Sequence, residues 1–172
     1  LSVLDPNNLQ IVRDGTRLSS LLIVPGGKSN PYLLAPAKRG TLSKVWYDAK
    51  AFGQGIERRM YVYTPYGYNP KDKAKFPVLY LQHGGGGDED AWETMGRASE
   101  ILDNMIASGQ AVPMIVVMPN DTPNQYAAPD VMDPVDDSSV IGQDMTSESF
   151  HAGGNYVKDL VEDIIPFIES HY

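Results

Sequence analysis

"PVLYLQHGGGGDEDAW", Pro77 to Trp92, is the stretch of sequence that decides the fold class of this chain. A near-continuous apolar run is followed by a histidine, four consecutive glycines and three acidic residues. An apolar run of this kind is typical of a parallel strand that is buried on both faces of a sheet. Glycine loses more backbone entropy on folding than any other residue, so four glycines at the end of a strand need a physical reason.

A second apolar run, "PMIVVMP" (Pro113 to Pro119), has the same character. Between the two runs, in "MGRASEILDNMIASGQ" (Met95 to Gln110), apolar residues recur at helical spacing and Gly109 is a natural helix stop. Strand, helix and strand in this order predict a right-handed βαβ unit with parallel strands. The sequence therefore predicts an α/β fold.

The segments on either side predict further elements. "TLSKVWYD" (Thr41 to Asp48) and "RRMYVYTP" (Arg58 to Pro65) are rich in β-branched and aromatic residues and predict an antiparallel pair of strands. "RLSSLLIV" (Arg17 to Val24) predicts another strand. "NYVKDLVEDIIPFIESHY" (Asn155 to Tyr172) has one apolar stripe and predicts an amphipathic helix. Pro166 within it should bend the helix or weaken it by about 3 kcal/mol.

Composition excludes several classes of protein. The 172 residues suffice for one sizeable core, and a net charge of −8 would repel the phosphate backbone of nucleic acid. No apolar run approaches the roughly 20 residues that a membrane span needs. The chain contains no cysteine, which excludes disulfides, thiolate metal sites and a cysteine nucleophile. The opening residues show no secretory signal and resemble the interior of a longer protein.

The glycine run lies at the carboxyl end of the first buried strand. In an open α/β sheet, ligands bind at the carboxyl ends of the strands. The backbone N–H groups of the glycine run could contact a phosphate or the oxyanion of an acyl-transfer intermediate. The phosphate motif G-x-G-x-x-G fits Gly84 and Gly86 but fails at Glu89, and "DED" at 88–90 would place negative charge beside the phosphate. The oxyanion interpretation fits better, and a plain surface turn is the alternative.

Several blocks together resemble a known family. "FPVLYLQHGGGGDEDAW", "GRASEILDNMIASGQAVPMIVVMPND" and "YVKDLVEDIIPFIESHY" are similar to the amino-terminal half of an esterase-D-like carbohydrate esterase, in particular the bacterial feruloyl esterase domains of xylan-degrading enzymes. The resemblance implies an α/β-hydrolase fold, a three-layer sandwich, with the amino-terminal half of its sheet in residues 37–172. Residues 1–36 resemble the tail of an immunoglobulin-like accessory domain with a linker.

The same resemblance implies a serine hydrolase with a Ser-His-Asp triad and no metal or organic cofactor. The backbone N–H of Gly85 would be an oxyanion donor, Gly84 and Gly86 would shape the loop, and His83 would support it. No serine of this chain stands in the G-x-S-x-G context of the family nucleophile. We therefore expect the serine, the acid and the base in a companion carboxyl-terminal segment of the same esterase.

Candidate substrate-binding residues are aromatic side chains and a histidine near the expected site. Tyr126, Phe150 and His151 belong to a long polar loop that follows the second buried strand, and ordinary loop packing is the alternative for each. Trp92 is a further candidate, although anchoring the return of the glycine loop into the following helix explains it better than a substrate contact does. The acidic residues within 129–139 could bind calcium, but they lack the EF-hand spacing, and a solvated loop explains them better.

The resulting hypothesis is a carboxylesterase that releases feruloyl, or less readily acetyl, groups from plant cell-wall xylan. Its partners would be the polysaccharide and the companion segment, and its location would be extracytoplasmic, either secreted or periplasmic. One alternative is a non-catalytic carbohydrate-binding module, against which we note that the 113–119 strand would keep an unpaired apolar edge. Another alternative is an esterase for acyl thioesters or siderophore esters.

Overall fold

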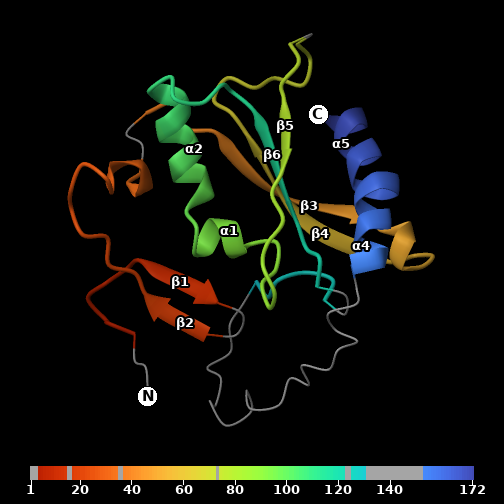
Figure 1. Cartoon of the computed structure of the whole chain (residues 1–172), viewed down its shortest axis with the longest axis horizontal. Coiled ribbons are helices and arrows are strands. Elements are labelled where there is room, and N and C mark those ends of the chain that lie inside the picture. Colours follow the sequence, from red (N-terminus) through yellow and green to blue (C-terminus); the bar gives the residue numbers. More distant parts are fainter. Residues whose placement is uncertain (1–3, 15–16, 35–36, 73, 123–124, 131–152) are drawn as a thin grey trace.

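The computed structural model describes residues 4–14, 17–34, 37–72, 74–122, 125–130 and 153–172. Its main sheet has four strands in the order β3-β4-β6-β5 (Figure 1). The bounds of these strands are Thr41–Asp48 for β3, Glu57–Thr64 for β4, Val78–Tyr80 for β5 and Ile115–Pro119 for β6.

The pairing of the strands confirms the predicted topology. β3 and β4 are antiparallel over their whole length, with Thr41 opposite Thr64 and Asp48 opposite Glu57. β5 and β6 are parallel, and the chain between them contains the helices α1 (Ala91–Thr94) and α2 (Ala98–Ala107). The βαβ unit is therefore present, and its main helix is shorter than the predicted 95–110 segment.

Side chains of β4 and β6 alternate between two hydrophobic cores, because successive residues of a strand point to opposite faces. One core contacts the carboxyl-terminal helix and the other contacts α2, so helices cover both faces of the sheet (Figure 1). This arrangement confirms the three-layer α/β fold. The strand residues of the first core are Met60, Val62, Ile115 and Val117, and those of the second are Tyr61, Tyr63, Val116 and Met118.

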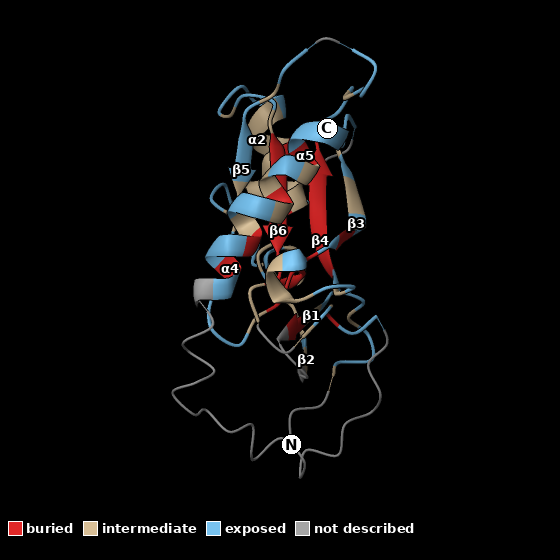
Figure 2. Ribbon diagram, turned by 90° about the vertical axis from the view of Figure 1, so that its right-hand side faces the viewer, coloured by how far each residue is buried: buried red, intermediate tan, exposed pale blue. Residues whose placement is uncertain are grey.

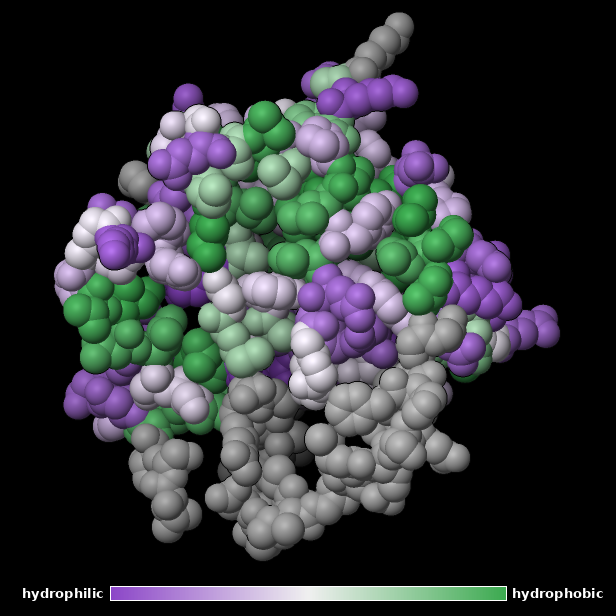
Figure 3. All heavy atoms as spheres, in the orientation of Figure 1, coloured by the Kyte–Doolittle hydropathy of each residue, from purple (hydrophilic) through white to green (hydrophobic). Residues whose placement is uncertain are grey.

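The outer edge of the sheet differs from the prediction. β6 has a neighbour on each side, so the expected unpaired edge of the 113–119 strand was wrong, and β5 is the edge strand instead. β6 is buried throughout, whereas Val78 and Leu79 of β5 are 37% and 43% exposed (Figure 2). Hydrophobic side chains gather in the middle of the face seen in Figure 3, where β5 lies. No described residue pairs with the outer edge of β5.

The predicted carboxyl-terminal helix is present but not uniform. It consists of α4 (Gly153–Asp159), a π-helical turn (Leu160–Ile164) and α5 (Ile165–His171). Pro166 lies in the first turn of α5. Proline lacks an N–H and its ring collides with the preceding turn of a regular α-helix, so we attribute the wider π-helical turn to this residue.

A small hairpin precedes the main sheet. β1 (Ile11–Asp14) pairs antiparallel with β2 (Arg17–Ser20), so the strand predicted for residues 17–24 ends at Ser20. The hairpin lies beside α1, and a short 3₁₀ helix, η1 (Asn30–Tyr32), lies beside α2. The assignment of residues 1–36 to an accessory domain stays a prediction. Within the described residues, none of the helices combines the length and the apolar character needed to cross a bilayer.

Candidate functional site

The glycines that follow β5 form a tight turn, here called the glycine turn (Gly84–Gly87). The N–H of Gly87 donates to the carbonyl of Gly84 over 3.1 Å, and Gly86 has a φ of +79°. A positive φ at the third position alone defines a type II turn, which requires glycine there. A β-carbon at Gly84 or Gly85 would meet nothing within 4 Å. The positive φ therefore explains the glycine at position 86, whereas Gly84 and Gly85 face open space.

His83 fixes the first carbonyl of the glycine turn. Its Nδ1 lies 2.8 Å from the carbonyl oxygen of Gly84, and its Nε2 accepts the backbone N–H of Asp121 over 3.0 Å. The imidazole is buried, and it joins the end of β5 to the end of β6. The supporting role expected of His83 in the active site stays a prediction.

The orientation of the Gly84–Gly85 peptide follows from these contacts. A trans peptide is planar, with its C=O and N–H pointing in opposite directions. The carbonyl of Gly84 points toward His83 and the N–H of Gly87, so the N–H of Gly85 points away from both. No described residue accepts a hydrogen bond from this N–H. Gly85 thus presents an unused backbone donor at an exposed position.

The contacts of His83 also affect its protonation. Burial disfavours the imidazolium, but the hydrogen bonds to Asp121 and to the carbonyl of Gly84 outweigh burial, and the pKa of His83 lies above its usual value. In the charged form, Nε2 can donate to the Asp121 carboxylate, whose Oδ1 lies 2.7 Å away. His83 is therefore engaged at both nitrogens, which favours a positioning role over that of a free general base.

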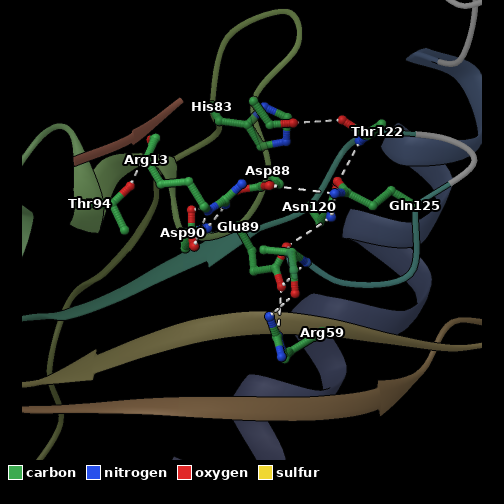
Figure 4. A network of polar contacts seen from close by, with 12 residues as sticks. Arg13, Arg59, His83, Asp88, Glu89, Asp90, Thr94, Asn120, Thr122 and Gln125 are labelled. Atoms are coloured by element: carbon green, nitrogen blue, oxygen red, sulfur yellow. Dashed lines mark hydrogen bonds and ion pairs between the residues drawn. The ribbon is translucent and has the colours of Figure 1, made fainter. Parts of the chain in front are cut away.

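The acidic residues after the glycine turn are buried and paired (Figure 4). The Nε of Arg59 donates to Glu89 over 2.7 Å, and Asn120 and the N–H of Ala128 also donate to the Glu89 carboxylate. Sequence reasoning treated this acidic run as a charge that would repel a bound anion. The structure shows that a buried guanidinium neutralises Glu89 instead.

A second arginine, Arg13, bonds both aspartates of the run. Nη2 of Arg13 lies 2.5 Å from Asp88, and Nε donates to Asp90 over 3.1 Å. Burial, together with the neighbouring Asp88, raises the pKa of Asp90 to about 6, although Arg13 opposes the rise. The pKa of Asp88 is lowered because its bonds to Arg13 and Asp90 outweigh its burial.

Comparison with known proteins identifies the family. Residues 53–172 match the family model "Esterase". The chain belongs to this esterase family. It is 38% identical over 136 residues to the endo-1,4-beta-xylanase/feruloyl esterase of Xylanibacter ruminicola, which is 77% of this chain and 16% of that protein. It is 29% identical over 142 residues to endo-1,4-beta-xylanase Y of Acetivibrio thermocellus, which is 82% of this chain and 10% of that protein. The esterase chain thus spans only a small part of these relatives.

Solved structures agree with this assignment. A CE1 ferulic acid esterase from Anaeromyces mucronatus, solved with ferulic acid, is 28% identical, with a TM-score of 0.64 over 89% of this chain and 51% of that one. A second solved structure, named FAE, is 27% identical, with a TM-score of 0.57 over 83% of this chain and 40% of that one. The chain therefore has the predicted α/β-hydrolase fold, and the partial coverage fits the expected half of that fold.

The structure describes two of the four candidate substrate-binding residues, and these two make different contacts. Trp92 is in α1 and its Nε1 donates to the carbonyl of Gln82 over 2.8 Å, so it anchors the end of β5 while its side chain stays partly exposed. Tyr126 is exposed, and its carbonyl accepts the N–H of Arg59. Phe150 and His151 lie outside the described residues. Contact of any of the four with a substrate stays a prediction.

Only part of the acidic segment considered for calcium binding lies within the described residues. Asp130 pairs with Arg59 over 2.9 Å and with the amine of Lys44, and the remaining acids of 129–139 lie outside the described residues. The described side chains include no group of three or more histidine, aspartate or glutamate residues suited to hold a metal ion.

Sequence reasoning missed the residues that support the glycine turn from a distance. Arg13, Arg59 and Asp121 all contact the segment from His83 to Asp90. The only local signal was the charge of "DED" directly after a buried strand, since acids at that position need partners if the chain folds over them. The sequence gives no indication of which arginines supply those partners.

Proposed function

We propose that this chain forms the oxyanion-binding part of a serine carboxylesterase that releases feruloyl groups from plant cell-wall xylan. The observation that carries the proposal is the unused N–H of Gly85, which the contact between His83 and Gly84 directs away from the turn. The substrate class is supported by the relatives, one of which is named a xylanase/feruloyl esterase and another of which was solved with ferulic acid.

The chemistry is acyl transfer to serine. The serine oxygen forms a bond to the ester carbonyl carbon, a base removes the hydroxyl proton, and negative charge collects on the former carbonyl oxygen. The N–H of Gly85 stabilises that oxygen. Collapse of the intermediate breaks the bond to the sugar oxygen, which takes up the proton from the base and leaves as a hydroxyl. Water then attacks the acyl-enzyme, which releases ferulate and restores the serine hydroxyl. Loss of one such donor typically slows the chemical step by roughly 10²–10³-fold.

The nucleophile belongs to a companion carboxyl-terminal segment in this proposal. No serine of the chain stands in a G-x-S-x-G context. The outer edge of β5 has no pairing partner among the described residues, and its apolar side chains are exposed. A strand of the companion segment that pairs with this edge would bring the serine beside the glycine turn. Because xylan lies outside cells, we also propose a secreted or periplasmic location.

The test is an assay of the chain together with its companion segment. A fluorophosphonate should label one serine of the companion segment, and the labelled protein should lose ferulate release from methyl ferulate. Acetate release from nitrophenyl acetate, measured in parallel, distinguishes a feruloyl from an acetyl esterase. A protein that takes up no label and releases neither acid would contradict the proposal and would favour a carbohydrate-binding module.

A further inference from the structure

Arg13 lies far from the glycine turn in the sequence, yet its guanidinium contacts the acids directly after that turn. It belongs to the β1–β2 hairpin, outside residues 53–172, which match the family model. We propose that Arg13 is a positioning residue that holds the glycine turn through Asp88. The β1–β2 hairpin would thereby contribute to the geometry of the proposed esterase site. This inference rests on the proposed function of Gly85.

The first step of the argument is the contact itself. Arg13 donates to both Asp88 and Asp90, and all three side chains are buried (Figure 4). The hydroxyl of Thr94 in α1 donates to the carbonyl of Arg13 over 3.1 Å, which fixes the backbone of β1 at the same place. Both the backbone and the side chain of Arg13 are therefore fixed by hydrogen bonds, and the side chain does not lie on the surface.

The second step is the path from Arg13 to Gly85. Asp88 directly follows Gly87, whose N–H closes the glycine turn and whose carbonyl accepts the hydroxyl of Thr122 over 2.8 Å. His83 fixes the start of the turn. Arg13 thus secures the residue after the turn, as His83 secures the first residue of the turn. Asp88 is three positions from Gly85 along the chain, so Arg13 can affect Gly85 without a conformational change elsewhere.

The third step is why the residue must be arginine. Asp88 and Asp90 lie close together, with the N–H of Asp90 3.4 Å from the Asp88 carboxylate. Their negative charges therefore repel each other when both side chains are ionised. A planar guanidinium can bond two carboxylates at once, whereas the compact ammonium of lysine acts as a point charge. Arg13→Lys therefore keeps the charge but loses the simultaneous hold on both aspartates.

A matched control separates this role from general docking of the amino-terminal segment. The side-chain amide of Asn104 donates to the carbonyls of Pro31 and Leu33, at 3.0 and 2.7 Å, and so anchors the same segment to α2. Asn104→Ala should loosen residues 30–34 without touching Asp88 or the glycine turn. Both variants disturb the attachment of the amino-terminal segment, but only Arg13→Lys disturbs the turn.

The experiment compares Arg13→Lys with Asn104→Ala in two readouts. In the esterase with its companion segment, Arg13→Lys should lower kcat for methyl ferulate about tenfold or more and change KM less than about twofold, because it misplaces a donor used in the transition state. Amide hydrogen exchange at Gly87, whose N–H closes the glycine turn, should be faster in Arg13→Lys than in wild type. Asn104→Ala should change neither kcat nor exchange at the turn.

The outcomes distinguish this inference from the proposed function. Equal kcat in Arg13→Lys and wild type overturns the role of Arg13. Equal exchange at Gly87 in the two variants overturns it as well. If the wild type releases no ferulate, the proposed function fails, and the exchange comparison alone decides whether Arg13 holds the turn. If Arg13→Lys does not fold, the double variant Arg13→Gln/Asp90→Asn, which removes one charge of each sign, takes its place with the same expected result.

Discussion

Two buried arginines decide the environment of the glycine turn at the scale of single residues. Arg59 is 2% exposed and Glu89 is 1% exposed, and they face each other with Asn120 and Ala128 completing the hydrogen bonds of the carboxylate. A buried ion pair adds little net stability compared with apolar packing, but removing one partner leaves an uncompensated charge. The pair therefore makes the site intolerant of substitution at either residue.

Glu89→Ala should lower the free energy of unfolding by about 3 kcal/mol, because Arg59 loses its buried carboxylate partner and keeps only the exposed carboxylate of Asp130. Urea denaturation measures this change. The control is Lys158→Ala, which removes an exposed pair with Glu162 at 3.9 Å and should change the free energy by less than about 0.5 kcal/mol. Similar values for the two variants would show that the buried pair is not important for stability.

Gly86→Ala should lower the free energy of unfolding by about 1 kcal/mol, since a side chain is strained at a φ of +79°. The matched control is Gly27→Ala, where a β-carbon meets nothing within 4 Å and φ lies outside the left-handed region. Thermal unfolding of both variants tests the turn geometry. A Gly86→Ala protein as stable as the control would contradict the type II assignment.

At the scale of elements, the carboxyl-terminal helix attaches to the sheet through a buried carboxylate. Asp159, the last residue of α4, accepts the hydroxyl of Tyr47 in β3 over 2.7 Å. Its other oxygen is buried without a partner among the described residues. Burial, with a smaller contribution from Asp163, raises the pKa of Asp159 to about 6, against the effects of Tyr47 and Arg58.

The sign of this shift gives a pH-dependent prediction. The pKa of Asp159 is higher in the folded than in the unfolded chain, so its ionisation destabilises the fold as pH rises from about 4 to about 6. Asp159→Asn removes that effect while keeping an acceptor for Tyr47. Its free energy of unfolding relative to wild type should be about 2 kcal/mol higher at pH 7 than at pH 4. A difference that stays constant between these pH values would contradict the shift.

At the scale of the whole molecule, local patterns predicted the elements and long-range contacts decided the site. The apolar run 113–119 and the helical spacing before it were sufficient for the βαβ unit, because each pattern is set by near neighbours in sequence. The edge position of β5 could not be predicted in this way, since a short apolar run has the same appearance at the edge and in the centre. Arg13 and Asp88 are 75 residues apart, so no local pattern links them.

The glycine turn lies between these two cases. Its position after a strand and the neighbouring His83 are visible in the sequence, and the structure adds the direction of the Gly85 N–H. That direction depends on contacts from β6 and on the planarity of one peptide. In the proposed function, the described chain would form one side of an acyl-transfer site and the companion segment would supply the other.

The most direct test of the central claim compares Gly85→Pro with Gly85→Ala in the esterase with its companion segment. Proline is favoured at the second position of a type II turn, so it should remove the N–H of residue 85 and leave the turn intact, whereas alanine keeps the N–H. We predict that kcat for methyl ferulate is about 100-fold lower in Gly85→Pro than in Gly85→Ala, with similar unfolding temperatures. Equal kcat in two folded variants would show that this N–H does not stabilise an oxyanion.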